Sequence, residues 1–511
     1  MNTLKPLVQK LELILNEFNI EEDIDIKITN IDDFDYQINN LVKYQKHNEI
    51  KEIEKKVSSI LSESKIIESW EISDKYFINI KISLSVLINS INPINNYLKS
   101  NKREKIIIDY GGPNIGKALH VGHLRSLNIG RSLYKINKFV GNDVVSDIHL
   151  GDWGMQIAQI LTFCHNQKID IDSLDAKKLL KIYPEAASLY KKDENFSKAA
   201  KEINKKLNDN NSEEIKKWKK IKKISEDSLK DTLAVLNHSF DLWLGESDVN
   251  NLIPKMINDL KDNNKVKLDN EALVSTEKTD PPVLITKSDG SYLYLTTDLA
   301  TIIYRLNNID FDKILYVVDN RQKLHFQQLF QSIKYFEFPN KEYEHVEFGT
   351  VNDEEGNPFR TRDGDTKLLS ELYEETYNYI KKINKDLEDD IVHELANTVL
   401  TYSDLLTNRK TDYKFNLDKF TNISGKTGLY VQYAQVRAKR ILEKFSGNTQ
   451  NIELSLTSNE ERSLVFALLN IDVYFNLSVK YNEPHHLADY LYEISNLFNI
   501  FYQQENILNI E

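Results

Sequence analysis

The sequence predicts a multidomain α/β protein built around a mainly parallel, doubly wound sheet. Short apolar runs recur between residues 106 and 318, and helical stretches separate most of them. From about residue 386 onward the apolar residues recur at helical spacing only. Strands that alternate with helices are typical of parallel sheets, because each parallel connection needs a crossover that a helix supplies. The chain of 511 residues is long enough for roughly two to four domains.

The strands of this sheet are expected in a central domain at residues 101–385. Runs rich in isoleucine, valine, leucine and tyrosine predict them. They lie at residues 106–108, 143–146, 283–286, 292–295 and 314–318. Within this domain the chain is highly charged and helical in pattern over much of residues 170–285. We therefore expect a helical insertion there.

An α+β domain is expected before the sheet, at residues 1–100. Residues 4–15 place leucines at the spacing of one helix face, and residues 76–82 alternate as a strand does. An all-α bundle is expected after the sheet, at residues 386–511. Its clearest helix pattern has an apolar face made of Val431, Ala434, Ala438, Ile441 and Leu442.

Composition limits the classes of function. The net charge of −12 argues against general nucleic-acid binding, although it allows one basic face on an acidic body. Cys164 is the sole cysteine, which excludes a disulfide framework and a cysteine-rich zinc site and fits a reducing cytoplasm. No run reaches the ~18 consecutive apolar residues of a membrane span. The composition therefore favours a cytoplasmic protein without a membrane partner.

A lysine-rich run at residues 216–223 has two interpretations. It is basic enough to contact RNA, but Glu213, Glu214, Glu226 and Asp227 flank it. Alternating charges of this kind are typical of a solvated helix face held by ion pairs. The flanking acids favour the solvated face.

Residues 113–126 carry the strongest chemical signal. An apolar strand precedes them and a helix pattern follows, and a loop between a strand and a helix N-terminus is a favourable site for phosphate. His120 and His123 add donors for charge that develops on a phosphate, and Gly122 between them leaves room for a nucleotide. This pattern is suited to an enzyme that opens ATP at the α-phosphate.

The same segment resembles the arginyl-tRNA synthetases, and its two histidines match the first signature of class I aminoacyl-tRNA synthetases. The resemblance extends in order over nearly the whole chain, through residues 149–154, 240–247, 289–300, 318–326, 360–364 and 428–434. It implies a Rossmann-type catalytic domain at 101–385, an added tRNA-contacting domain at 1–100 and a helical anticodon-binding domain at 386–511. It also implies ATP-dependent ligation of L-arginine to tRNA(Arg) through arginyl-adenylate. Mg²⁺ is expected to accompany ATP, and no dedicated metal site is expected.

The resemblance implies a set of residues that contact arginine. A planar guanidinium needs carboxylate, amide or phenol oxygens around it. The implied contacts are Asn114, His120, Glu246, Tyr294, Asp298 and Gln322. Four of them have a plainer alternative: Asp298 as a helix cap, Tyr294 as strand packing, and Glu246 and Gln322 as ordinary loop residues. For residues 152–154 a turn with a packed tryptophan is as well supported as a ligand role.

The second class I signature departs from its usual form. The lysine-rich loop of the family falls here at residues 358–362, where neither usual lysine is present. The resemblance implies that Lys117, just before the histidine signature, substitutes for the missing lysine of the second signature. Arg360 and Arg362 are expected to add positive charge. ATP contacts are thus expected from Lys117, His120, Gly122 and His123. The alternatives are a surface lysine and a solvated basic turn.

The helical domain is expected to bind tRNA through Tyr430, Gln432 and Tyr433, although some of these side chains will be core. The sequence ends at residue 511, where the family usually continues for another helix or two that help to form the anticodon-binding face. This departure bears on anticodon affinity more than on adenylate chemistry, and a truncation, an incomplete gene and a naturally shortened form are the alternatives. The resemblance further implies that tRNA binds before arginine is activated. We expect a monomer. The alternatives are a catalytically weakened tRNA-binding paralogue and another class I synthetase.

Overall fold

The computed structural model describes residues 4–29, 31, 33–90, 103–209, 212–288, 290–357, 359, 367–445, 455–504 and 507. The chain forms two compact units. One comprises Met1–Lys99, Val431–Leu477 and Asp489–Glu511, and the other comprises Ser100–Tyr430 and Ser478–Ala488. These units divide the chain differently from the three expected domains, because the helices just after residue 386 belong to the unit of the sheet.

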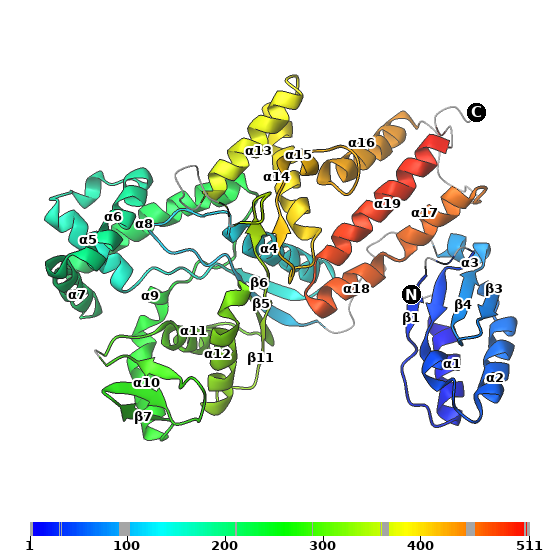
Figure 1. Ribbon diagram of the computed structural model, residues 1–511, viewed down its shortest axis with the longest axis horizontal. Helices are drawn as coiled ribbons and strands as arrows, with labels where there is room; N and C mark the ends of the chain where they lie inside the picture. The colour runs from blue at the N-terminus through cyan, green and yellow to red at the C-terminus, as the bar shows by residue number, and fades with distance from the viewer. Residues whose placement is uncertain are drawn as a thin grey trace. The chain divides into compact units, whose positions relative to one another are not determined.

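A four-stranded parallel sheet lies at the centre of the second unit (Figure 1). Its strands run in the order β11, β10, β5, β6 and span Glu342–His345, Lys313–Val317, Lys105–Tyr110 and Asp143–Asp147. Ile108 of β5 packs into a core with α4 (His123–Phe139). The neighbouring Ile107 packs into a separate core with the helix α11 (Tyr294–Asn308). Both faces are therefore covered, and the predicted doubly wound α/β fold is confirmed.

Two of the five predicted strands do not belong to this sheet. β9 (Leu284–Thr286) pairs antiparallel with β8 (Ala272–Ser275), which pairs with β7 (Val266–Asp269) in a small separate sheet. The strand expected at 292–295 is wrong, because α11 (Tyr294–Asn308) begins within it. Leu295, Leu299 and Ile302 are buried at helical spacing, so a period of 3.6 residues outweighs the β propensity of this tyrosine-rich run.

The predicted insertion is helical for most of its length. α5 (Met155–Asn166), α6 (Ala176–Lys192), α7 (Glu194–Asn208) and α8 (Ser212–Val235) pack on one another as a lobe of their own (Figure 1). The short α9 (Glu246–Val249) and α10 (Ile253–Asp262) follow, before the small antiparallel sheet. α12 (Lys323–Tyr335) and α11 cover one face of the parallel sheet.

The second unit continues through α13 (Leu369–Ile383), α14 (Asp389–Leu405) and α15 (Leu417–Phe420). The expectation of helices only after residue 386 is wrong at β13 (Tyr413–Lys414), which pairs in parallel with β12 (Val351–Asn352). A strand of two residues is too short to show an alternating pattern in the sequence.

The first unit contains an antiparallel sheet in the order β1, β2, β4, β3, so the expected α+β architecture is confirmed. The strands span Ile26–Ile28, Tyr36–Ile38, Ile78–Ile82 and Ile67–Ile72, and the helices α1, α2 and α3 span Lys5–Glu17, Ile50–Glu63 and Leu84–Asn89. The C-terminal helices α16, α17, α18 and α19 span Gly428–Lys444, Asn459–Leu469, Ile471–Tyr481 and His485–Gln504. Leu442, expected on the apolar face of α16, is 74% exposed.

Helix α17 packs against this antiparallel sheet. Arg462 contacts both carboxylate oxygens of Asp35 at 2.8 and 2.7 Å, and Tyr36 donates to Asn470 at 2.6 Å. Asn459–Tyr481 passes the length and hydropathy criteria of a membrane span, although such a single stretch is weak evidence. Its side chains Phe466 and Leu469 pack on the core of the sheet. We attribute the apolar character of this stretch to that packing.

A buried ion pair joins α4 to α14 in the second unit. The Arg125 Nε atom lies 3.0 Å from Asp404, and both side chains are almost wholly buried. Arg125 also donates to the carbonyl oxygens of Gly349 and Thr411 at 3.1 and 2.7 Å, and Asn128 donates to Asp404 at 3.0 Å. Together these contacts attach α14 and the segment around Thr411 to α4.

We expect Asp404→Asn to destabilise the second unit by about 3 kcal/mol, because it leaves the Arg125 charge buried without its partner. The thermal midpoint of unfolding checks this. Lys198→Ala is the control, since it breaks only the exposed pair with Glu194 and should barely move the midpoint. An unchanged midpoint for Asp404→Asn would contradict the assignment.

Candidate active site

The signature loop connects the carboxyl end of β5 to the start of α4 at His123. It lies along the segment after β6: Gly151 N–H donates to Pro113 at 3.0 Å, and Ile115 N–H donates to Gly151 at 3.1 Å. A Cβ atom on Gly151 would lie 1.9 Å from Asn114 Oδ1. Glycine is therefore needed for Asn114 to take its place beside this segment.

His120 and His123 lie against each other, with ring centroids 4.0 Å apart. Gly122 N–H donates to His120 Nδ1 and His120 N–H to His123 Nδ1, both at 3.1 Å. We therefore assign the proton of neutral His120 to Nε2, whereas His123 Nδ1 also lies 3.2 Å from the His120 carbonyl oxygen, so that either His123 tautomer has a partner. Burial, together with the neighbouring His120, lowers the pKa of His123 to about 3, and burial also lowers that of His120. The pair offers neutral donors rather than cations.

Gly122 makes space for a neighbouring histidine. A Cβ atom at this position would meet the His120 ring at 2.8 and 2.9 Å. The missing side chain therefore accommodates His120, and the role of Gly122 toward a nucleotide stays a prediction.

Lys117 lies in the same loop, where its amide donates to Asn114 at 3.3 Å. Its ammonium lies over the ring of Tyr183 on α6, 4.7 Å from the centroid. After burial, the charge of Lys117 is the next cause that lowers the pKa of His120. Lys117 is thus placed near the histidines, and its contact with ATP stays a prediction.

Arg360 and Arg362 lie outside the described residues, but the two ends of their loop are placed. Lys367 N–H donates to Phe359 at 3.4 Å, and Val121 N–H donates to Lys367 at 3.0 Å. Leu369 N–H donates to Leu119 at 2.9 Å. The described residues on either side of the second signature, Phe359 and Lys367, therefore lie beside the first signature.

Three of the expected arginine contacts come together from two helices. Tyr294 and Asp298 lie one turn apart on α11, and Glu246 is the first residue of α9. Burial raises the pKa of Glu246 to about 8, with further contributions from Asp152 and Asp298. Burial and then the Glu246 charge raise the pKa of Tyr294. The three side chains thus share one electrostatic environment.

The plainer alternatives for two of these residues are wrong. Asp298 lies inside α11 and does not cap it, and its carboxylate contacts His325 Nε2 at 2.6 Å. Tyr294 is 75% exposed, so it is not packed in a core. Gln322 is exposed at the end of a 3₁₀ turn (Asn320–Gln322) after β10, immediately before α12, which also carries His325.

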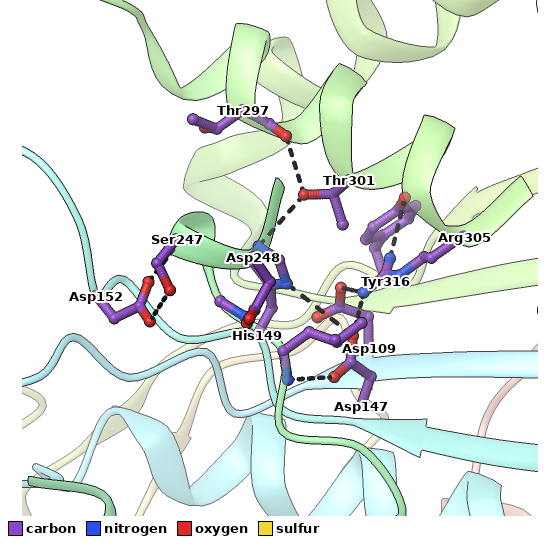
Figure 2. Close-up of polar contacts among 12 residues, drawn as sticks. Asp109, Asp147, His149, Asp152, Ser247, Asp248, Thr297, Thr301, Arg305 and Tyr316 are labelled. Carbon is purple, nitrogen blue, oxygen red and sulfur yellow. Dashed lines mark hydrogen bonds and ion pairs between the residues drawn. The ribbon is translucent and has the colours of Figure 1, made fainter. Parts of the chain in front are cut away.

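A buried arginine lies beneath these residues. Arg305 of α11 donates to Asp109 at the end of β5 and to Asp147 at the end of β6, both at 2.5 Å (Figure 2). Its second terminal nitrogen donates to Tyr316 of β10 at 3.4 Å. The guanidinium thereby fixes the helix of Tyr294 and Asp298 to three strands.

His149 lies between this ion-pair group and Thr301 of α11. Its Nε2 atom lies 3.4 Å from the Thr301 hydroxyl, and its Nδ1 atom lies 4.0 Å from Asp147 (Figure 2). Asp109, Asp147 and His149 together have the spacing of metal ligands. Because Arg305 already contacts both carboxylates, we assign no metal to them.

Sequence reasoning missed Arg305, His325 and Arg437. Arg305 lies in an apolar helix pattern without a motif, so only its burial in the fold identifies it. Arg437 of α16 lies over the Tyr433 ring at 4.1 Å and donates to the Tyr433 hydroxyl at 2.9 Å and to Asn499 at 2.7 Å. Tyr433 is 43% exposed, whereas Tyr430 and Gln432 are half-buried. Of the three expected tRNA contacts, Tyr433 is the most accessible.

Three family models match successive parts of the chain. They are the class I tRNA synthetase (R) catalytic domain at residues 86–417, the DALR anticodon binding domain at 431–511 and the arginyl tRNA synthetase N terminal domain at 3–82. The arginine–tRNA ligase of Francisella tularensis subsp. novicida is 34% identical, with 92% of this chain and 86% of that protein covered. The arginine–tRNA ligase of Agathobacter rectalis is also 34% identical, with 90% and 85% covered.

Solved structures agree with these matches. The arginyl-tRNA synthetase of Plasmodium falciparum superposes with a TM-score of 0.81 at 26% identity, covering 99% of this chain and 93% of that one. The Thermus thermophilus enzyme shares the fold, with a TM-score of 0.80 at 21% identity over 98% and 92% of the two chains. The three family models and the relatives that match along the whole length establish that this chain belongs to the arginyl-tRNA synthetase family.

Proposed function

We propose that the protein ligates L-arginine to tRNA(Arg) in two steps. An oxygen of the arginine carboxylate attacks the α-phosphorus of ATP, the bond to the bridging oxygen breaks, and diphosphate leaves. A ribose hydroxyl of the terminal adenosine of tRNA then attacks the carbonyl carbon of arginyl-adenylate and releases AMP. The observation that carries the proposal is the pair of carboxylates Glu246 and Asp298 with the phenol of Tyr294, in a chain of this family. Glu246 N–H donates to Leu150, next to the residue that pairs with the signature loop.

The first step needs donors for the charge that develops on phosphate. His120 supplies an Nε2–H group, with His123 beside it, and burial lowers the pKa values of both rings so that they are neutral at physiological pH. Lys117 supplies the mobile cation, and Arg360 and Arg362 are proposed to approach the triphosphate from the second signature. Since phosphoryl chemistry depends chiefly on positioning and charge stabilisation, no covalent role is needed from any of them. Mg²⁺ is proposed to enter with ATP.

The second requirement is selection of arginine. Glu246 and Asp298 offer carboxylates, and Tyr294 a phenol, to a planar guanidinium that has five donors. Asn114 and His120 are proposed to hold the α-amino and carboxylate end, with Gln322 at the rim. Lysine lacks the fork geometry, so it would leave acceptors unpaired, which is a strong basis for discrimination.

The tRNA is proposed to contact α16, where Arg437 holds Tyr433 at the surface for stacking on an unpaired base. The protein is also proposed to be a monomeric, cytoplasmic enzyme without a membrane partner. Neither alternative, a weakened tRNA-binding paralogue or another class I synthetase, is supported by the family matches.

The purified full-length chain should exchange labelled diphosphate into ATP when arginine and tRNA are both present. Lysine in place of arginine should support little exchange, because its ammonium leaves acceptors unpaired, and exchange should fall sharply without tRNA. Exchange that depends on another amino acid but not on arginine would overturn the proposal.

We expect Lys117→Ala to slow adenylate formation by roughly 100-fold or more, the effect of removing one charge-stabilising donor from a preorganised site. Single-turnover measurement of arginyl-adenylate formation checks this. Lys198→Ala, which changes an exposed lysine on α7, is the control. Near-normal formation by Lys117→Ala would remove this residue from the catalytic group.

A further inference from the structure

Helix α8 holds the segment beside the arginine site through two side chains one turn apart. Trp218 Nε1 donates to the Asp152 carbonyl at 2.7 Å, and Lys222 Nζ lies 2.6 Å from Asp152 Oδ2. Asp152 is fully buried, and the Lys222 side chain is 17% exposed. Helix α8 therefore binds both the main chain and the side chain of Asp152.

The carboxylate of Asp152 is in turn fixed to the start of α9. Its Oδ1 accepts the Ser247 N–H at 2.9 Å, and its Oδ2 accepts the Ser247 hydroxyl at 2.6 Å (Figure 2). Lys222 also donates to that hydroxyl at 3.1 Å. A Cβ atom on Gly245 would meet all three atoms of the carboxyl group at 2.6 Å. The contact thus needs glycine immediately before Glu246.

We propose that Lys222 is a positioning residue for the arginine site. Its ammonium fixes Asp152, whose carboxylate binds Ser247 and packs against Gly245, the residues on either side of Glu246. It also offsets the negative charge of Asp152 next to the carboxylate proposed to receive the guanidinium. This inference rests on the proposed function, because it assigns Glu246 to the substrate side chain.

Glu246 lies among other carboxylates, so the negative charge of Asp152 needs a cation such as Lys222 beside it. Asp152 and Asp298 face Glu246, and both disfavour its ionised form. Lys222 faces Asp152, with Asp248 at 3.7 Å and Glu226 at 3.8 Å from its ammonium. Tyr294 is the phenol that responds to the Glu246 charge, and His325 pairs with Asp298. Burial opposes the charge on Lys222, but the surrounding carboxylates raise its pKa, so it remains a cation.

Other lysines of the same run behave as a solvated face. Lys217 pairs with Glu213 and Glu214 on its own helix, and the 78% exposed Lys223 pairs with Asp227. Such exposed pairs contribute little. Lys222 therefore differs from Lys223 in burial and in the element that it contacts, which makes Lys223 a matched control one residue away.

The test uses the full-length enzyme with tRNA and follows diphosphate exchange for Lys222→Met, Lys222→Arg and the control Lys223→Met. Lys222→Met should raise KM for arginine roughly 10- to 100-fold, the cost of leaving a buried charge without its partner. KM for ATP and kcat should change little. Lys222→Arg should recover most of the affinity, and Lys223→Met should match the wild type.

The pH profile separates charge from structure. The KM for arginine should fall as pH rises, because Glu246 must ionise to bind the guanidinium. In Lys222→Met this fall should occur at higher pH, because the negative charge of Asp152, no longer offset, disfavours ionised Glu246. Asp152→Asn should move it to lower pH, since it removes that charge and leaves Lys222 in place. A purely structural role would give no opposite shifts.

Three results would overturn the inference while wild-type exchange with arginine stays intact. They are an unchanged arginine KM in Lys222→Met, equal losses in the arginine and ATP parameters, or the same pH shift in both variants. If Lys222→Met does not fold, the direction of the Asp152→Asn shift decides. Failure of the wild type to use arginine would instead contradict the proposed function.

Discussion

The buried contact of Arg305 with Asp109 and Asp147 determines where the rest of the site can lie. A guanidinium in a protein interior needs carboxylate partners, and it finds them at the carboxyl ends of two adjacent parallel strands. From these strand ends one loop leads to His120 and the other to Asp152, while α11 carries Tyr294 and Asp298 from the opposite side. The loop proposed to contact ATP and the helix proposed to contact arginine thus share one anchor.

Charge balance explains why this site is suited to arginine. Arg305 supplies one positive charge to the two carboxylates of Asp109 and Asp147, and Lys222 supplies one to Asp152, so with Glu246 and Asp298 the carboxylates outnumber these two cations. Burial, and then the charges of Asp152 and Asp298, raise the pKa of Glu246. His120 and His123 add no positive charge, because burial lowers their pKa values. A substrate with a permanently charged, planar side chain supplies the missing cation and fits the available acceptors.

Sequence reasoning predicted the parallel sheet, the α+β architecture before it and the helices after it, because strand–loop–helix patterns are local signals. Glu246, Asp298 and the histidine roles came from the family resemblance, and their contacts with substrates stay predictions. Sequence reasoning failed at residues 292–295, where burial on the sheet selected a helix, and at the two-residue strand β13. It could not find Arg305 or Lys222, because one lies in an apolar helix and the other in a solvated-looking lysine run. Their roles depend on partners distant in sequence, at Asp147 and Asp152.

The most direct test of this charge-deficit account is proton release when arginine binds, measured by titration calorimetry in buffers of different ionisation enthalpy. With the pKa of Glu246 raised to about 8 in the free site, binding near pH 7 should release close to one proton, because the guanidinium requires the ionised carboxylate. The release should diminish as pH rises through the pKa. Arginine binding without proton release near pH 7 would contradict the account.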